Sequence, residues 1–200
     1  MSGTASHLDS FTILGVSIQV VVMGGFSNFT RLASRYLLEE KLGRNDKTGL
    51  AQFSPGEWYP LVSYLRVLER IDRDYGDSTV KQMGSCVPKY IPLPPTLTDI
   101  EQAFGAIDVA YHLNHGCGGK PMYSPETGVM TEGIGHYTCQ RHPPQKQLSC
   151  RVDSVYPCAF DEGLLLTMAQ RFEPTAALRH EPGACRKTGG PQCVYTLTWR

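Results

Sequence analysis

The chain has 200 residues, of which 41% are hydrophobic, and its 19 basic and 19 acidic residues cancel. This length and apolar content predict one compact domain, with at most an N-terminal extension. A protein that holds nucleic acid through the phosphates normally carries a basic excess. The neutral balance therefore argues against a nucleic-acid partner.

The most apolar run of the chain, residues 11–25, is too short to span a membrane and is interrupted by Ser17 and Gln19. It also lacks the basic flank of a signal peptide. Apolar residues alternate with these two polar residues, which predicts a strand. We therefore expect a cytoplasmic protein without a membrane span. Residues 1–26 would form an N-terminal extension with a strand, and residues 27–200 the main domain.

The middle of the chain predicts helices. Apolar residues repeat at helical spacing in residues 29–37 and 61–75, and a helix near 100–111 has its apolar residues on one face. Residues 77–83 predict a short helix. The Pro-rich stretch 87–95 predicts a connector that cannot be helical throughout.

The second half of the chain predicts strands around one late helix. We expect strands near 129–140, 146–155, 175–181 and 192–199, and a helix near 158–172. Helices come first and a small antiparallel sheet with a late helix follows, so the pattern predicts an α+β fold.

The seven cysteines are a high and odd count. In a chain with no export signal they indicate free buried thiols or metal ligands more than a disulfide framework. They stand at positions 86, 117, 139, 150, 158, 185 and 193.

Three of these cysteines are predicted to lie close together. Cys193 falls on the apolar face of the last strand, Cys185 lies across a Gly-rich turn from it, and Cys158 begins the late helix. With His180 or Glu181 as a fourth ligand they would make a tetrahedral zinc site of structural type. The spacing contains no Cys-x-x-Cys pair, so three buried cysteines beside an exposed His-Glu pair remain an open alternative.

Three segments resemble a known family. VYPCAFDEGLLLTMAQRF (155–172) and ALRHEPGACRKTGGPQCVYTLTW (177–199) resemble the C-terminal half of bacterial 4-vinyl reductase-type sensor domains. WYPLVSYLRVLERIDRDYG (58–76) resembles domains of this kind in myxobacterial proteins. The resemblance implies N-terminal helices packed on a four-stranded antiparallel sheet around a ligand cavity. Haem NO/oxygen-binding domains and the vesicle-tethering TRAPP subunits share that fold.

The resemblance also implies a zinc site. In the phenol-sensing regulators of the family, a structural zinc is held by Cys, Glu, Cys and Cys. Cys158 matches the first ligand, and Cys185 with Cys193 match the last two. Pro182 stands where the acidic ligand is expected, so one of the His-Glu pair before it would have to serve instead.

Haem is the alternative cofactor, because haem-binding relatives use a helix histidine as axial ligand and a Tyr-x-Ser-x-Arg motif for the propionates. His112 is the axial candidate, but it falls on the polar face of its helix, so a solvated histidine is expected there. His115, at the end of the same helix, is expected on the surface. Tyr137-Thr-Cys-Gln-Arg141 matches the motif with Cys139 in place of Ser, but it falls one strand too early in the predicted order, which favours a chance match.

The leading hypothesis is a non-enzymatic sensor that binds a small hydrophobic or aromatic molecule, or a tetrapyrrole, in an apolar cavity. A haem-binding gas sensor is the first alternative and a dimerising interaction scaffold the second. A tetrapyrrole-reductase activity follows only from the family name, since no set of residues supports its chemistry. Signalling would require a homodimer or a partner protein. The predicted cavity residues, which are equally typical of an ordinary core, are Trp58, Tyr64, Phe104, Tyr111, His112 and Phe160.

Overall fold

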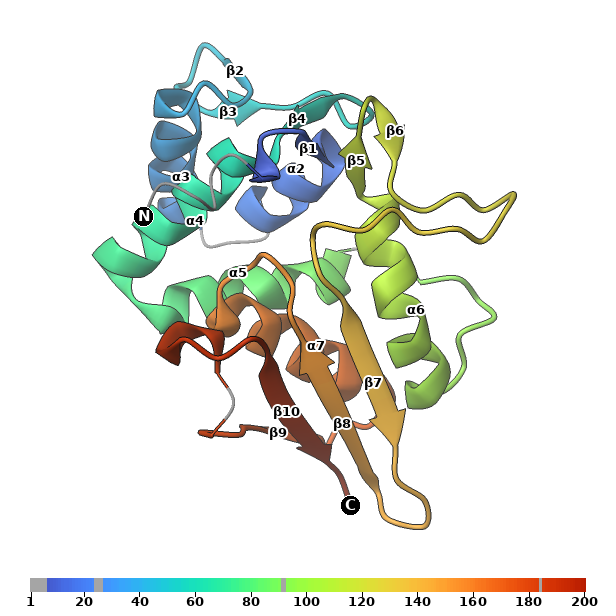
Figure 1. Ribbon diagram of the computed structural model, residues 1–200. Coiled ribbons are helices and arrows are strands. Elements are labelled where there is room, and N and C mark those ends of the chain that lie inside the picture. The colour runs from blue at the N-terminus through green and yellow to red at the C-terminus, as the bar shows by residue number, and fades with distance from the viewer. Residues whose placement is uncertain (1–6, 24–26, 91–92, 184) are drawn as a thin grey trace. The chain divides into compact units, whose positions relative to one another are not determined.

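The computed structural model describes residues 7–23, 27–90, 93–183 and 185–200, and the chain divides into two compact units (Figure 1). Both units combine helices with antiparallel strands, which confirms the predicted α+β class. Unit 1 comprises Met1–Thr79 and Ala110–Gly133, and unit 2 comprises Val80–Val109 and Ile134–Arg200.

Unit 1 combines helices with a four-stranded sheet, and the sequence did not predict this sheet. The sheet has the order β4-β1-β5-β6, and a separate hairpin is formed by β2 and β3. The helices are α2 (Gly15–Met23), α3 (Ser27–Glu39) and α4 (Leu61–Tyr75), joined by the C-terminal end of α6 (Ile100–Leu113). The strands are β1 (Phe11–Leu14), β2 (Arg44–Asn45), β3 (Ala51–Gln52), β4 (Trp58–Pro60), β5 (His115–Cys117) and β6 (Lys120–Pro121).

The strand predicted in the apolar N-terminal run is correct only for β1. At Gly15 the backbone turns from β1 into α2. The N–H of Gly15 donates to the carbonyl of Glu57, and an added Cβ would lie 2.2 Å from the carbonyl oxygen of Ser54, so a larger residue would not fit at this turn. Ile18 and Val21 are then buried at helical spacing, although the residues around them alternate in polarity. The strand prediction from Gly15 onward is therefore wrong.

Unit 2 is built on the predicted antiparallel sheet and its late helix. The strand order is β7-β8-β10-β9, and α7 covers one face of this sheet (Figure 1). Its elements are α5 (Asp77–Tyr90), whose first residues belong to unit 1, most of α6, β7 (Tyr137–Arg141), β8 (Gln147–Val152), α7 (Cys158–Phe172), β9 (Ala177–His180), a 3-10 turn (Arg186–Thr188) and β10 (Cys193–Thr198).

The sheet of unit 2 buries alternate residues of its central strands, as a sheet with one covered face must. In β8 and β10 every second side chain is buried, while the residues between them are half-buried or exposed. The six buried residues are Leu148, Cys150, Val152, Cys193, Tyr195 and Leu197.

Two elements of unit 2 differ in length from the prediction. The helix expected over residues 77–83 continues to Tyr90 and includes Pro88. Pro88 lies in the last turn, and Arg171 donates to its carbonyl oxygen, one of the carbonyls that a helix end leaves without an intrahelical partner. β7 begins at Tyr137 and not near residue 129, since Gly133 and Gly135 adopt positive φ just before it.

In the ranges that the structure covers, no helix has both the length and the apolar character needed to cross a membrane.

Candidate functional site

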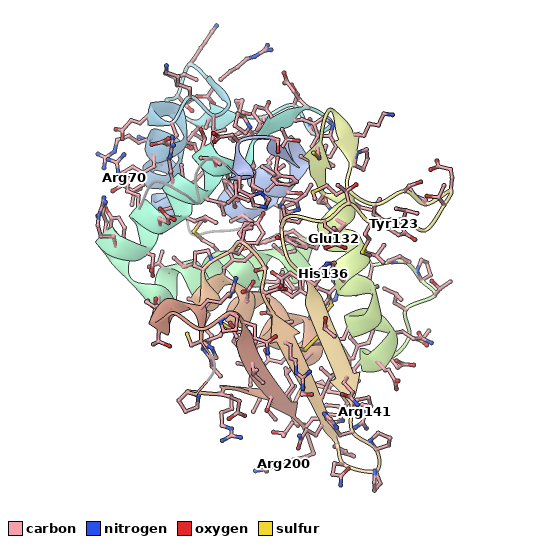
Figure 2. The ribbon with its side chains drawn as sticks, viewed as in Figure 1. Arg70, Tyr123, Glu132, His136, Arg141 and Arg200 are labelled. Carbon is pink, nitrogen blue, oxygen red and sulfur yellow. A yellow bond between two sulfur atoms is a disulfide. The ribbon has the colours of Figure 1, made fainter. Side chains whose placement is uncertain are left out.

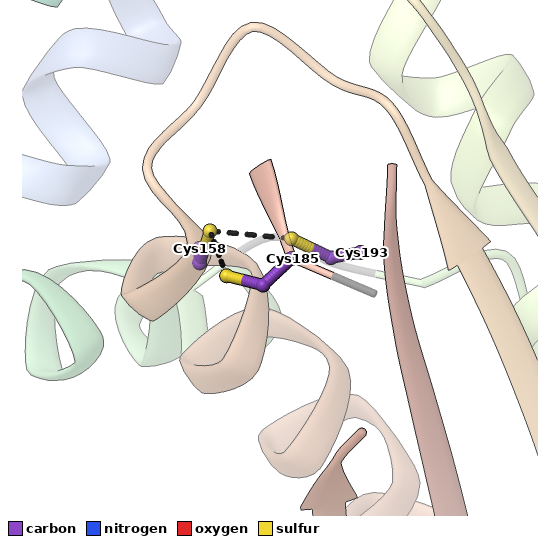
Figure 3. Close-up of side chains that lie close together, drawn as sticks. All are labelled: Cys158, Cys185 and Cys193. Carbon is purple, nitrogen blue, oxygen red and sulfur yellow. Dashed lines mark hydrogen bonds between the residues drawn. The ribbon is translucent and has the colours of Figure 1, made fainter. Parts of the chain in front are cut away.

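The three cysteines predicted to lie together do so in unit 2, where they form the three-cysteine cluster (Figure 3). The Sγ atom of Cys158 lies 3.2 Å from that of Cys193 and 3.7 Å from that of Cys185. All three sulfur atoms lie within 4.8 Å of one another. This arrangement is compact enough for one metal ion to contact every sulfur.

Local structure explains why the cluster forms. Cys158 is the first residue of α7, and the alternation of β10 turns Cys193 inward, where it is completely buried. The N–H of Gly190 donates to the carbonyl of Cys185 over 2.9 Å, and Gly189 adopts a φ of 88°. The Gly-rich turn therefore folds back on itself and brings Cys185 beside the other two sulfurs.

The thiols of the cluster differ in acidity. Burial by itself would raise the pKa of Cys193, but the backbone N–H and side chain of Arg186, which approach its sulfur at 3.4 and 3.5 Å, lower this pKa to about 6. Burial, together with the neighbouring Cys193, raises the pKa of Cys158 to about 12. Cys193 is therefore the more acidic thiol of the pair, and binding of a metal as thiolates would release protons.

A buried ion pair adjoins the cluster. Arg186 donates to Asp161, which is fully buried and also accepts from the hydroxyls of Tyr137 at 2.5 Å and Ser154 at 3.1 Å. Burial raises the pKa of Asp161 to about 7, while Arg186 and the two hydroxyls act in the opposite direction by stabilising the carboxylate. Arg186 thus joins the three-cysteine cluster to the carboxylate of Asp161.

The two proposed fourth ligands make other contacts. His180 lies 3.0 Å from Glu162 through Nδ1, and its ring lies against that of Tyr195. Glu181 accepts from Thr196 at 2.7 Å and pairs with an arginine of β9. Among the described residues, the three cysteines form a group whose sulfur atoms all lie within 4.8 Å of one another. Neither His180 nor Glu181 belongs to this group. The fourth ligand stays a prediction.

Four of the predicted cavity residues lie in unit 1. Trp58 is half-buried in β4 and Tyr64 is buried in α4. Tyr111 and His112 follow one another in α6, with their rings in edge-on contact at 5.3 Å. His112 is completely buried, so the expectation of a solvated helix histidine is wrong.

His115 is a buried histidine that the sequence placed on the surface. It begins β5 and pairs with Ile13 of β1, so it belongs to the sheet that was not predicted. Its Nδ1 lies 2.7 Å from the carbonyl oxygen of Tyr111, which can only accept, so Nδ1 carries the proton and Nε2 the lone pair. Burial, with a further contribution from His112, lowers the pKa of His115 to about 4 and keeps the imidazole neutral.

The remaining two predicted cavity residues lie in unit 2. Phe104 is buried in α6, and Phe160 is buried in the first turn of α7, where it stacks on Tyr156 at 4.7 Å between ring centroids. Tyr156 precedes α7 and is itself buried. Whether these aromatics face a ligand stays a prediction.

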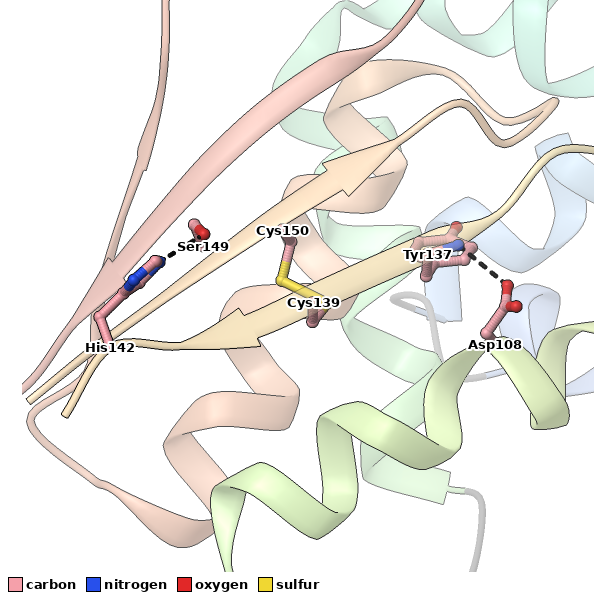
Figure 4. Close-up of a disulfide and its surroundings, with 6 residues drawn as sticks. All are labelled: Asp108, Tyr137, Cys139, His142, Ser149 and Cys150. Carbon is pink, nitrogen blue, oxygen red and sulfur yellow. Dashed lines mark hydrogen bonds between the residues drawn. A yellow bond between two sulfur atoms is a disulfide. The ribbon is translucent and has the colours of Figure 1, made fainter.

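Unit 2 also contains a disulfide that the sequence did not predict (Figure 4). Cys139 of β7 and Cys150 of β8 are direct partners in the strand register, with their Cα atoms 4.1 Å apart. The signal for this bond is the register of the hairpin, which the sequence alone does not provide.

The disulfide lies within the segment that matches the Tyr-x-Ser-x-Arg motif, and all three key side chains of that segment bond inside unit 2. Tyr137 donates to Asp161, and Cys139 is disulfide-bonded. Arg141, at the turn end of the sheet (Figure 2), donates to carbonyl oxygens of the β7–β8 turn and lies over the ring of Trp199 at 4.6 Å. The segment forms the first strand of the sheet in unit 2.

Comparison with known proteins identifies the fold. No protein-family model and no curated protein matches the sequence. Among solved structures, an H-NOX protein from S. oneidensis in the Fe(II)NO ligation state matches with a TM-score of 0.64 and 16% identity, over 94% of this chain and 99% of that one. The Fe(II) unliganded H-NOX protein from K. algicida matches with a TM-score of 0.61 and 12% identity, over 94% and 97%. This confirms the predicted likeness to haem NO/oxygen-binding domains, while the likeness to 4-vinyl reductase-type domains and TRAPP subunits stays a prediction. The chain has the fold of the H-NOX proteins.

Proposed function

We propose that this chain is a small-molecule sensor domain and not an enzyme, and that haem is its ligand. The observation that carries the proposal is the extent of the shared fold, which covers 94% of this chain and nearly all of H-NOX structures in Fe(II) states. Bound haem would supply an iron centre able to take a diatomic gas. An apolar or aromatic molecule is the runner-up ligand.

The buried histidines of unit 1 fit an iron ligand. A histidine ligand must be neutral and commonly donates its other ring N–H to a carbonyl or carboxylate. His115 meets both conditions through its contact with Tyr111 and its low pKa. His112, the axial candidate, is buried on α6. Both are therefore candidates for the axial position.

The segment that matches the propionate-binding motif, residues 137–141, is less suited to haem than the two histidines are. Tyr137, Cys139 and Arg141 are engaged by a buried carboxylate, a disulfide and the β7–β8 turn respectively. We assign no haem contact to this segment. If haem binds, its propionates must be held by other groups.

Haem addition followed by absorption spectroscopy tests the proposal. We expect the wild-type protein to bind about one haem per chain with a Soret band distinct from that of free haem. Ala substitution of the axial residue, His112 or His115, should shift or abolish this band. His142→Ala is the matched control, because His142 lies at the β7–β8 turn and contacts Ser149. A wild-type spectrum identical to free haem would refute the haem assignment.

The three-cysteine cluster supports a second assignment, a structural zinc. Three sulfurs within 4.8 Å of one another match the ligand number of a Cys₃ site with one further ligand. Arg186, beside Cys193, would compensate part of the negative charge of the thiolates. The cluster joins the start of α7 to the start of β10, so a metal there would clamp the helix to the sheet.

Metal analysis of protein purified without added metal tests the zinc assignment. We expect about one zinc per chain, lost in Cys185→Ser together with part of the resistance to thermal unfolding. Cys86→Ser is the matched control, since Cys86 is a free buried thiol of α5 that bonds to a backbone carbonyl. If the wild type contained no zinc and unfolded at the same temperature as Cys185→Ser, a structural zinc would be contradicted.

The proposed sensor would act through a homodimer or a signalling partner protein. No surface of the described residues is assigned to that role, and the prediction rests on the sequence alone.

A further inference from the structure

The disulfide of unit 2 joins the edge strand of the sheet to its neighbour. In the described sheet β7 pairs with β8 alone and is an edge strand. Cys139 is half-buried on this edge, whereas Cys150, on the second strand, is completely buried. Cys139 is therefore the more accessible of the two cysteines to a reagent in solution.

β7 connects three elements of unit 2. The backbone N–H of Tyr137 donates to Asp108 of α6 over 2.9 Å, and the ring of His136 contacts the same carboxylate at 2.9 Å (Figure 4 shows Asp108 and Tyr137). The hydroxyl of Tyr137 donates to Asp161 of α7. Because Cys139 lies two residues further along the strand, the disulfide fixes β7 to β8 close to where β7 holds both helices.

We propose that Cys139–Cys150 is a reversible thiol–disulfide switch that sets how firmly β7 is held to β8 and, through Asp108, to α6. The proposal is independent of haem and zinc, since neither the histidines of unit 1 nor the three-cysteine cluster takes part. Five cysteines stay free, including Cys158 and Cys193 with their sulfurs 3.2 Å apart. The chain thus combines one disulfide with close, unbonded thiols.

The reductant is a dithiol. Its thiolate attacks Sγ of Cys139, which forms a mixed disulfide and releases Cys150 as a thiolate that takes a proton. The second thiol of the reductant then attacks its own sulfur in the mixed disulfide and releases Cys139, which is protonated in turn. Two electrons and two protons pass to the protein, and the reductant leaves as a cyclic disulfide.

The reduced state retains the strand pairing. Five residue pairs join β7 to β8, from Tyr137 opposite Val152 to Arg141 opposite Leu148, and Cys139 with Cys150 is only the central one. Backbone hydrogen bonds and the contacts of Tyr137 therefore remain after reduction. We expect β7 to open more often, not to detach.

Differential alkylation with peptide mass mapping tests the chemistry. The full-length protein is equilibrated in buffers of dithiothreitol and its oxidised form, and each cysteine is scored separately. We expect Cys139 and Cys150 to change together and reversibly. Full alkylation of both in the most oxidising buffer would show that no disulfide forms and would overturn the proposal.

Hydrogen exchange tests the structural effect. On reduction, the amides of residues 137–141 should exchange roughly tenfold faster. The Cys139→Ser/Cys150→Ser double variant is the control, because its β7 amides should not respond to the reductant. Unchanged exchange in reduced wild type would overturn the switch. Unfolding of the whole of unit 2 on reduction would also overturn it, in favour of a static structural bond.

Discussion

We expect Gly163→Ala to lower the free energy of unfolding by about 3 kcal/mol, because overpacking against a rigid backbone costs this much. Gly163 lies in α7 against α5, and an added Cβ would stand 1.9 Å from the carbonyl oxygen of Lys81 and 2.9 Å from the backbone nitrogen of Ser85. Neither contact can be relieved by rotating a side chain. The two helices would have to separate.

The contact is reciprocal, which strengthens the prediction. Gly84 of α5 faces α7 in the same way, with an added Cβ 2.0 Å from the carbonyl oxygen of Phe160. Each helix therefore presents a glycine to the backbone of the other. Separation would displace α7, which carries Cys158 and Asp161, so Gly163→Ala should also weaken metal binding at the three-cysteine cluster.

Gly105→Ala is the matched control. Gly105 lies in α6, and beyond its chain neighbours and the backbone of its own helix no atom lies within 4 Å of an added Cβ. The same substitution should therefore raise stability by up to about 1 kcal/mol through helix propensity alone. Urea unfolding of the three proteins measures the difference. Equal effects at Gly163 and Gly105 would show that α5 and α7 are not in backbone contact.

The elements that could be predicted are those whose pattern is local. α7 was predicted from its apolar residues with the observed bounds, Cys158–Phe172, and the alternation of β10 correctly turned Cys193 inward. These signals repeat over many residues within one element. The approach of Cys158, Cys185 and Cys193 followed from them once α7 was assumed to pack on the sheet.

The features that were missed depend on pairing between distant segments. The strands of unit 1 have two to four residues each, too few to show an alternating pattern. His115 was consequently placed on the surface. The Cys139–Cys150 bond depends on the register of β7 and β8, which a shift of one residue would change.

The ion pair between Asp161 and Arg186 was missed for the same reason. An acidic residue in the first turn of a helix is usually explained by the helix dipole, and such residues are mostly exposed. Here the carboxylate is fully buried, and its partner lies 25 residues later in the Gly-rich turn. The local pattern that explains an exposed acid does not reveal a buried one.

Asp161→Ala should cost about 3–5 kcal/mol of stability at pH 8, because removing one partner of a buried ion pair leaves the other charge without compensation. The guanidinium of Arg186 is only 16% exposed and would keep its charge. The hydroxyls of Tyr137 and Ser154 would lose an acceptor as well. The measurement belongs above pH 7, since the pKa of Asp161 is about 7 and the wild-type carboxylate must be ionised for the comparison.

A double substitution separates the lost charge from lost packing. Asp161→Ala/Arg186→Met removes both charges, so it should cost less than Asp161→Ala alone even though it changes more atoms. Arg73→Ala is the surface control: Arg73 pairs with Asp74 but is 71% exposed, and its loss should cost under about 1 kcal/mol. If the double variant were less stable than Asp161→Ala, the main contribution of Arg186 would be its contact with Cys193. The stability of the sheet would then depend on the three-cysteine cluster more than on the buried carboxylate.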